Sequence, residues 1–407
     1  MPGFRHLPAE DIQRILQDLR DRYQDGFPIL KELLQNADDA GASEPEGAAS
    51  QLVLVLAKNG LPGAKHPLLQ TAGLAVLNDG AFTASDAISI TSLGLSNKAG
   101  QADTADKFGL GLKSIFHWAE AFFYFSPHTF AEDGEHHAAP CGLLNPWWSQ
   151  EVLDGRHEDW EQAWQSGSEE DIAAFQQLAK QALGGARWFG LWIPLRQPGH
   201  LQDGKGQIKP IEQRFPEAEL DALLGQAWQT RLVETLPLLR RLRTVRVCEL
   251  GDQGLADRGK FDVPSDAQRM RFGLNGAPTE PSWHQSLTGI IQSGGYAVPA
   301  CSFAGVEQAN GLATLEEIKR QKNWPNQTAI GEDGGDLQVP EKAEPHGAVV
   351  FTRQRVKGDG ALRVHHAVFL PLGEPEECDC PGDWRYNLYL HGFFFVDSGR
   401  RPLGRRG

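Results

Sequence analysis

A short segment near the N-terminus gathers oxygen-bearing side chains on one side of a predicted helix. Glu32, Asn36 and Asp39 stand at positions i, i+4 and i+7. Because successive helical residues are about 100° apart, these side chains share a sector roughly 60° wide. Pro28 suits the first turn of this helix and Gly41 its end. The stripe of carboxylate, amide and carboxylate therefore predicts either a ligand site or an amphipathic surface helix whose acids are solvated.

Two later segments favour the ligand site. Leu74–Gly80 reads as an apolar strand that ends in the polar pair Asn78–Asp79. Lys107–Ser114 is a glycine-rich turn that leads into a buried helix. Such a turn lets backbone N–H groups approach phosphate oxygens, helped by the positive end of the next helix. A lone Gly-x-Gly is weak evidence, but these three features within about 80 residues form a stronger combination.

At these residues the chain resembles the GHKL ATPases, which include gyrase, the ninety-kilodalton heat-shock chaperones, histidine kinases and mismatch-repair MutL. Within them it is most similar to the sacsin-type ATP-binding domain. The pieces that carry the resemblance, in order, are ELLQNADDAGA, LNDGAF, SLGLSNK and KFGLGLKSIFH. Other branches continue the strand-end Asp as Asp-x-Gly-x-Gly, whereas here Gly80–Phe82 follows, a departure that the sacsin branch shares. The resemblance covers most of residues 20–126.

The resemblance implies ATP and Mg²⁺ as ligands and gives each motif residue a role. Glu32 resembles the general base that polarises the attacking water. Asn36 resembles the Mg²⁺ ligand, since a hard cation takes oxygen donors. Asp79 resembles the residue that accepts the adenine amino proton. Asp39 is expected to orient this shell or to be structural. Lys98 is expected to neutralise phosphate charge from a lid, with an exposed loop lysine as the competing interpretation.

Further nucleotide contacts are expected, by the same resemblance, beside these residues. They are Ala40 after the helix and Phe108, Gly109, Leu110, Gly111 and Leu112 in the glycine-rich turn.

A basic residue from the second domain is expected to complete the site. In related enzymes such a residue reaches the γ-phosphate, and Arg400 and Arg401 lie in a glycine-containing turn after a long apolar strand. A guanidinium there would stabilise charge on the transferred phosphoryl group. The two arginines face opposite sides of an extended chain, so either is a candidate. The competing interpretation is a solvated basic tail.

The resemblance implies an α+β fold. Residues 1–200 are expected to form a GHKL (Bergerat) α/β sandwich, a mixed sheet with helices on one face. Residues 201–407 are expected to form a transducer-like α/β domain, after a boundary rich in Gly, Pro and Gln near 197–210. The strand at 188–195 offers only Trp188, Phe189 and Gly190 where related ATPases place a Thr near adenine, so a water or a backbone group is expected to replace that Thr.

Composition is that of a cytoplasmic enzyme. The 407 residues include 40 % hydrophobic side chains, enough for sizeable cores, and carry no apolar run long enough to span a membrane. Five dispersed cysteines fit a reducing compartment better than a disulfide framework. A net charge of −14 argues against a general nucleic-acid surface. Since sacsin-like proteins are often long, the chain is expected to be either a minimal ATPase or the N-terminal part of a longer protein.

Three functions remain in competition. The leading hypothesis is an ATP hydrolase in which lid closure drives a conformational change, with a chaperone-like or remodelling role, a protein client or partner domain, and an ATP-dependent homodimer. The second is an ATP-gated DNA clamp of MutL or MORC type, which the acidic charge disfavours. The third is a nucleotide-sensing module of a defence or signalling complex with little turnover, which would not need Glu32.

Overall fold

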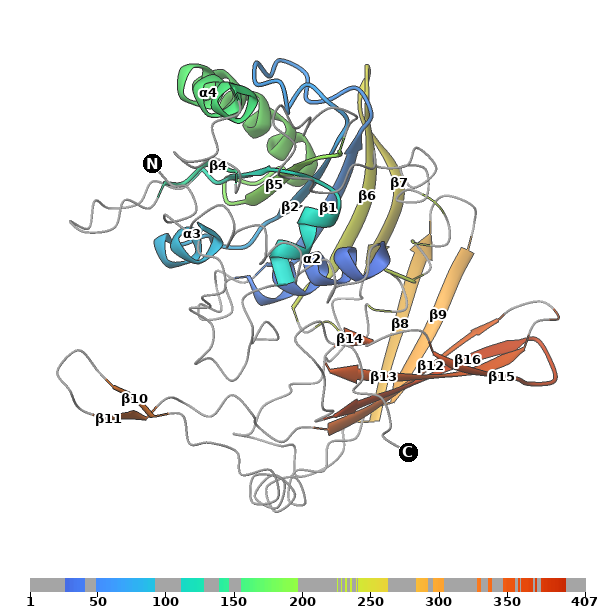
Figure 1. Cartoon of the computed structure of the whole chain (residues 1–407). Coiled ribbons are helices and arrows are strands. Elements are labelled where there is room, and N and C mark those ends of the chain that lie inside the picture. Colours follow the sequence, from blue (N-terminus) through green and yellow to red (C-terminus); the bar gives the residue numbers. More distant parts are fainter. Residues whose placement is uncertain are drawn as a thin grey trace.

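The computed structural model places an N-terminal α/β layer structure beside a group of C-terminal strands (Figure 1). The residues described are 26–40, 49–91, 111–127, 139–145, 155–196, 241–262, isolated positions between 225 and 239, and the parts of 283–392 named below. Lys98, Phe108, Gly109, Leu110, Arg400 and Arg401 lie outside them.

The N-terminal layer is a seven-stranded sheet with the order β4-β3-β5-β2-β1-β6-β7. Only the β1–β6 pair is parallel; the other neighbours are antiparallel. The sheet is therefore mixed, as predicted. Its strands are β1 (Gln51–Ala57), β2 (Gly73–Asn78), β3 (Phe122–Phe125), β4 (Gly142–Leu144), β5 (Phe189–Pro194), β6 (Thr244–Gly251) and β7 (Gly254–Asp262).

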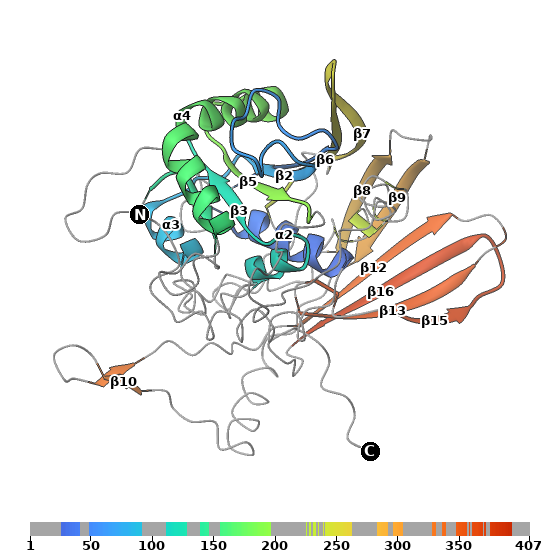
Figure 2. The ribbon, with the colours of Figure 1, turned by 45° about the horizontal axis from the view of Figure 1, so that its top comes forward.

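Helices cover both faces of this sheet. The helix α2 (Phe27–Asp39) and the 3₁₀ helix η3 (Gly111–His117) share one core with the β1 leucines, and α4 (Gly155–Leu183) shares a second core with the β1 valines. Side chains alternate along a strand, so the unbroken apolar run of β1 supplies both cores. Figure 2 shows α2 and α4 on opposite sides of the strands. The prediction of helices on one face is therefore wrong.

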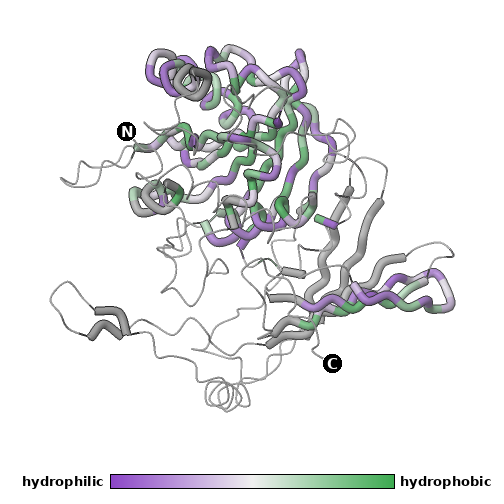
Figure 3. The backbone as a smooth tube through the Cα atoms, viewed as in Figure 1, coloured by the Kyte–Doolittle hydropathy of each residue, from purple (hydrophilic) through white to green (hydrophobic). Residues whose placement is uncertain are grey.

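The sheet continues past the boundary predicted near residue 200. Thr244 pairs with Gln51 in register, and β6 then runs along the whole of β1 before β7 forms the sheet's last strand. In Figure 3 hydrophobic residues are concentrated in the strands of this sheet, as expected for a layer that is buried on both faces.

The C-terminal described part consists of strands. The hairpin β8 (Trp283–Ile291)–β9 (Tyr296–Phe303) contacts β7 on one side and β12 on the other. The last sheet has the order β12-β16-β13-β14, with β15 also paired to β13. The remaining elements are α3 (Ala84–Thr91), β10 (Thr328–Ile330), β11 (Asp336–Gln338), β12 (Gly347–Arg355), β13 (Ala361–Val368), β14 (Leu370–Pro371), β15 (Glu376–Asp379) and β16 (Trp384–Gly392).

Within the part of the chain that the structure describes, no helix is both long enough and apolar enough to cross a membrane.

Candidate functional site

The helix α2 carries the acidic stripe into the interior of the protein. Gly26, with φ of 88°, precedes the helix, and Pro28 occupies its first turn. The leucines of α2 are buried against the sheet. Glu32 and Asp39 are also buried, each only 2 % exposed, while Asn36 is half-buried. A solvated surface stripe is therefore excluded, because carboxylates this deep must be held by other polar groups.

The strand-end carboxylate of Asp79 is held by the start of β1. The backbone N–H groups of Ser50 and Gln51 donate to Asp79 Oδ1 at 2.7 and 2.8 Å. The Ser50 hydroxyl donates to Asp79 Oδ2. Arg187 Nε donates to the Asp79 carbonyl oxygen at 2.9 Å. These donors fix the carboxylate at the end of β2, and they leave acceptor capacity on Oδ2 for a ligand.

Glycine at position 80 lets three elements meet beside Asp79. A Cβ atom there would lie 2.9 Å from the Ala40 Cβ, 2.9 Å from the Asn78 Oδ1 and 3.1 Å from the Ala49 Cβ. The end of α2, the start of β1 and the turn after β2 are therefore in direct contact. Ala40 therefore lies against the turn that carries Asp79, and sequence reasoning assigned both residues to one site.

Two polar atoms near this junction are buried without protein partners. Among the described residues, Asn36 Nδ2 and Ser114 Oγ have no hydrogen-bond partner. Asn36 belongs to α2 and Ser114 to η3, and these two helices lie against each other. A buried polar group is usually satisfied, so unpartnered ones indicate a place where a ligand can bind. The Asn36 amide nitrogen and the Ser114 hydroxyl can both donate to phosphate oxygens, whereas Mg²⁺ would take the oxygen of the same amide.

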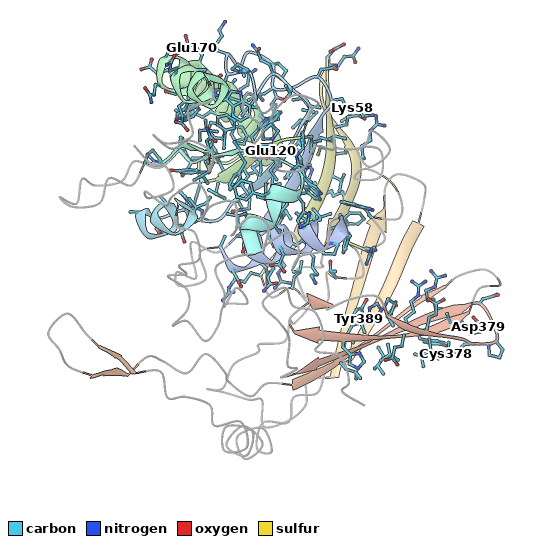
Figure 4. All side chains as sticks on the ribbon, viewed as in Figure 1. Lys58, Glu120, Glu170, Cys378, Asp379 and Tyr389 are labelled. Atoms are coloured by element: carbon cyan, nitrogen blue, oxygen red, sulfur yellow. The ribbon has the colours of Figure 1, made fainter. Side chains whose placement is uncertain are left out.

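The 3₁₀ helix η3 begins at Gly111, inside the glycine-rich turn that the sequence predicted at 107–114. Leu112 is half-buried against the core on the α2 side. Arg196 donates to the carbonyl oxygens of Phe116 and His117 at 2.9 and 3.0 Å, and its Nε lies 2.5 Å from the buried carboxylate of Glu120. Figure 4 shows Glu120 inside the N-terminal layer. Arg196 therefore satisfies the carbonyl end of η3, whose first residues belong to the predicted glycine-rich turn.

An aromatic pair lies beside the end of β2. Phe189 pairs with Asn78 across β2 and β5, and its ring stacks on Phe82 with centroids 4.4 Å apart. Asn78 Oδ1 accepts the Gly80 N–H at 2.9 Å. The wall next to Asp79 is thus aromatic rather than hydroxylic, as the sequence indicated.

Sequence reasoning missed the residues that position Asp79 and α2. Ser50 and Arg187 hold Asp79, and Asp38 binds the chain before β6. Asp38 Oδ1 accepts the backbone N–H groups of Arg241 and Leu242 at 2.7 and 2.8 Å. The adjacent acids Asp38 and Asp39 could have indicated this contact, because only Asp39 lies on the polar stripe of the helix and Asp38 needs another explanation. Ser50 gave no signal beyond its place before a strand.

A second buried polar cluster lies on the α4 face. Asp171 Oδ1 accepts the backbone N–H groups of Lys65 and His66 at 2.6 and 3.1 Å. His66 Nδ1 accepts the Leu68 N–H, so Nε2 carries the proton and donates to the Trp160 carbonyl at 2.9 Å. This cluster holds the loop between β1 and β2 on α4.

Burial shifts the ionisation of two groups on that face. It lowers the pKa of His66 from 6.5, against the opposing influence of the Trp160 carbonyl and the Asp171 charge. It also raises the pKa of Glu161 to about 7, although a hydrogen bond from Asn145 works the other way. Both groups therefore favour their neutral forms in the folded protein.

Comparisons with known proteins agree with the motif series. Residues 9–142 match the family model described as the Sacsin domain. Over 112 residues the chain is 34 % identical to sacsin of Homo sapiens. That stretch is 25 % of this chain and 2 % of the human protein, so the chain spans a small fraction of the length of this relative. The comparisons therefore support a sacsin-type domain in the N-terminal region.

Proposed function

We propose that the N-terminal region binds Mg²⁺ and ATP at the junction of α2, β1 and the turn after β2, and hydrolyses the nucleotide as a GHKL-type ATPase. The observation that carries this proposal is the convergence at Gly80 of Ala40, Ala49 and the Asp79 turn, one helical turn from the unpartnered amide nitrogen of Asn36. The similarity of residues 9–142 to the Sacsin domain supports the same assignment.

Each residue takes the role that its place in the fold suits. Asp79 accepts the adenine amino proton on Oδ2, because Oδ1 already takes two N–H groups. Asn36 contributes an oxygen to Mg²⁺, which neutralises phosphate charge when bound. Glu32 orients and polarises the attacking water, and its burial keeps competing solvent away. Asp39 positions this shell from the last turn of α2.

Residues outside the described part complete the proposal. Lys98 and residues 108–110, which precede the described Gly111 and Leu112, hold the phosphates, and Arg400 or Arg401 reaches the γ-phosphate from a transducer-like domain. Nucleotide-dependent closure then changes the conformation of the chain or brings two copies together, provided that ATP binds the closed state better. The resemblance to sacsin favours a chaperone-like or remodelling role in the cytoplasm, with a protein client.

Titration calorimetry with ATP, ADP and GTP, with and without Mg²⁺, tests the binding step. Asp79→Asn is the informative variant, because its amide oxygen can still accept the N–H groups of Ser50 and Gln51. Its amide nitrogen can donate to the Ser50 hydroxyl, so the local structure survives while adenine faces a donor. We expect ATP binding to be lost with an unchanged melting temperature. Wild-type affinity in Asp79→Asn would overturn this site.

Phosphate release tests the hydrolytic step. Glu32→Gln and Glu32→Ala are expected to bind ATP but to turn over roughly 10²–10⁴-fold more slowly, the usual contribution of a general base. The glutamine variant controls for the cavity that alanine leaves at this buried position. Wild-type protein that binds ATP without releasing phosphate would instead be a nucleotide sensor, and salt-sensitive binding to plain duplex DNA would favour the clamp.

A further inference from the structure

Four consecutive backbone N–H groups, at residues 241–244 where β6 begins, donate to Asp38 and Ser50. Those of Arg241 and Leu242 donate to the Asp38 carboxylate. Those of Arg243 and Thr244 donate to the Ser50 carbonyl oxygen at 2.7 and 3.1 Å. Asp38 and Ser50 thus accept all four backbone N–H groups of the 241–244 segment, although Arg241 lies 203 positions after Asp38 in the chain.

Ser50 also faces the other way, toward the adenine-binding carboxylate of the proposed site. Its N–H and hydroxyl donate to Asp79 while its carbonyl accepts from Arg243 and Thr244. Asp38 is two residues from Asn36 on the same helix. The 241–244 segment therefore connects the helix that carries the proposed Mg²⁺ ligand with the residue that reads the base.

Asp38 stands where a carboxylate is unfavourable unless this contact is made. It is 4 % exposed and lies in the last turn of α2, where the helix dipole disfavours negative charge. Burial of a charge without hydrogen bonds is costly, and charge-assisted bonds from backbone N–H groups offset that cost. If the segment moved away, Asp38 and two buried N–H groups would lose these bonds together. The end of α2 and the 241–244 segment should therefore move as one unit.

We infer that Asp38 and Ser50 are positioning residues of the nucleotide site. Because both bind the 241–244 segment, they fix the positions of Asn36 and Asp79 relative to each other. This inference rests on the proposed function. Coupling of this kind is reciprocal: if the bound segment favours ATP, ATP must stabilise the bound segment by the same factor. Since Thr244 is the first residue of β6, the coupling reaches the β6–β7 edge of the sheet and the β8–β9 hairpin that contacts it.

Hydrogen exchange of the wild-type protein, with and without Mg²⁺ and ATP, gives the first test. ATP is expected to slow exchange of the amides at 241–244. The amides of Lys65 and His66, which are bound in the same way by Asp171 on the opposite face, serve as internal controls and should not respond. This measurement needs no variant. ATP binding without slower exchange at 241–244 would overturn the inference and leave the proposed function standing.

Affinity measurements on matched variants give the second test. Asp38→Ala should weaken ATP binding by about 5- to 150-fold, the usual range for coupled sites, and should speed exchange at Arg241 and Leu242. Asp38→Asn keeps an oxygen that accepts both N–H groups and should restore affinity to within a few-fold, about threefold at most. Asp171→Ala should lower the melting temperature but leave ATP affinity unchanged. Equal affinity losses in Asp38→Ala and Asp171→Ala would reduce Asp38 to a structural role.

These experiments distinguish failure of the proposed ATP binding from failure of the coupling through the 241–244 segment. If the folded wild-type protein does not bind ATP, the proposed function fails, and the coupling fails with it. If it binds ATP and Asp38→Ala binds equally well, the coupling alone is wrong.

Discussion

On each face of the N-terminal sheet a buried aspartate binds two consecutive backbone N–H groups, but the two contacts lead to different parts of the molecule. On the α2 face Asp38 accepts two consecutive backbone N–H groups from a distant segment, and on the α4 face Asp171 does the same. The Asp171 contact leads only to the loop between β1 and β2 and to His66. The Asp38 contact leads through Ser50 to Asp79. A buried carboxylate that binds backbone N–H groups therefore has a structural role in both places. Whether it also positions a binding site depends on the residues that its contact connects.

The largest effect is expected from breaking the buried ion pair on the α2 face. Arg196→Ala leaves Glu120 buried without this cation and removes the donors to the end of η3, so unfolding free energy should fall by about 3–5 kcal/mol. ATP affinity should fall as well, because η3 carries Gly111 and Leu112 of the proposed phosphate-binding turn. Urea unfolding and calorimetry measure the two effects. Wild-type stability in Arg196→Ala would show that the α2 face does not depend on this pair.

A pair of glycine substitutions compares the two faces directly. An added Cβ at Gly80 would meet Ala40 at 2.9 Å, and one at Gly190 would meet Phe175 at 2.5 Å on the α4 face. Both alanine variants should lose about 1–3 kcal/mol of stability through overpacking. Only Gly80→Ala should also weaken ATP binding, because only it displaces α2 from the Asp79 turn. Equal effects of both variants on ATP affinity would remove the functional distinction between the faces.

The smallest effect is a pH dependence of stability that belongs to the α4 face. The folded pKa of His66 is lowered, so the unfolded chain takes up its proton first and His66 removes stability as pH falls below 6.5. The folded pKa of Glu161 is raised from 4.5 to about 7, so the folded chain holds that proton and Glu161 removes stability as pH rises through this window. The two contributions oppose each other.

Single variants separate these contributions in urea unfolding across the same pH window. Glu161→Gln should lose stability on acidification more steeply than wild type, and His66→Gln should lose it less steeply. ATP affinity should stay at the wild-type value in both. Parallel pH profiles for both variants and the wild type would show that neither group governs stability on this face.

Several elements could be predicted because their signals are local. The helix α2 and the strands β2 and β5 lie where the sequence predicts a helix and two strands. The contact of Ala40 with Gly80, next to Asp79, joins two of the sequence motifs, while the roles assigned to those residues stay predictions.

The sequence by itself determined which residues are apolar, where strands and α2 run, and which side chains could carry chemistry, because each of these depends on neighbours a few positions apart. Only the tertiary structure decided that α4 covers the second face, that β6 joins β1, and that Ser50 and Asp38 hold Asp79 and the 241–244 segment. These contacts join residues separated by up to 204 positions, and no local pattern encodes them. They exist because each buried carboxylate must find donors, and packing of the whole sheet decides which backbone supplies them.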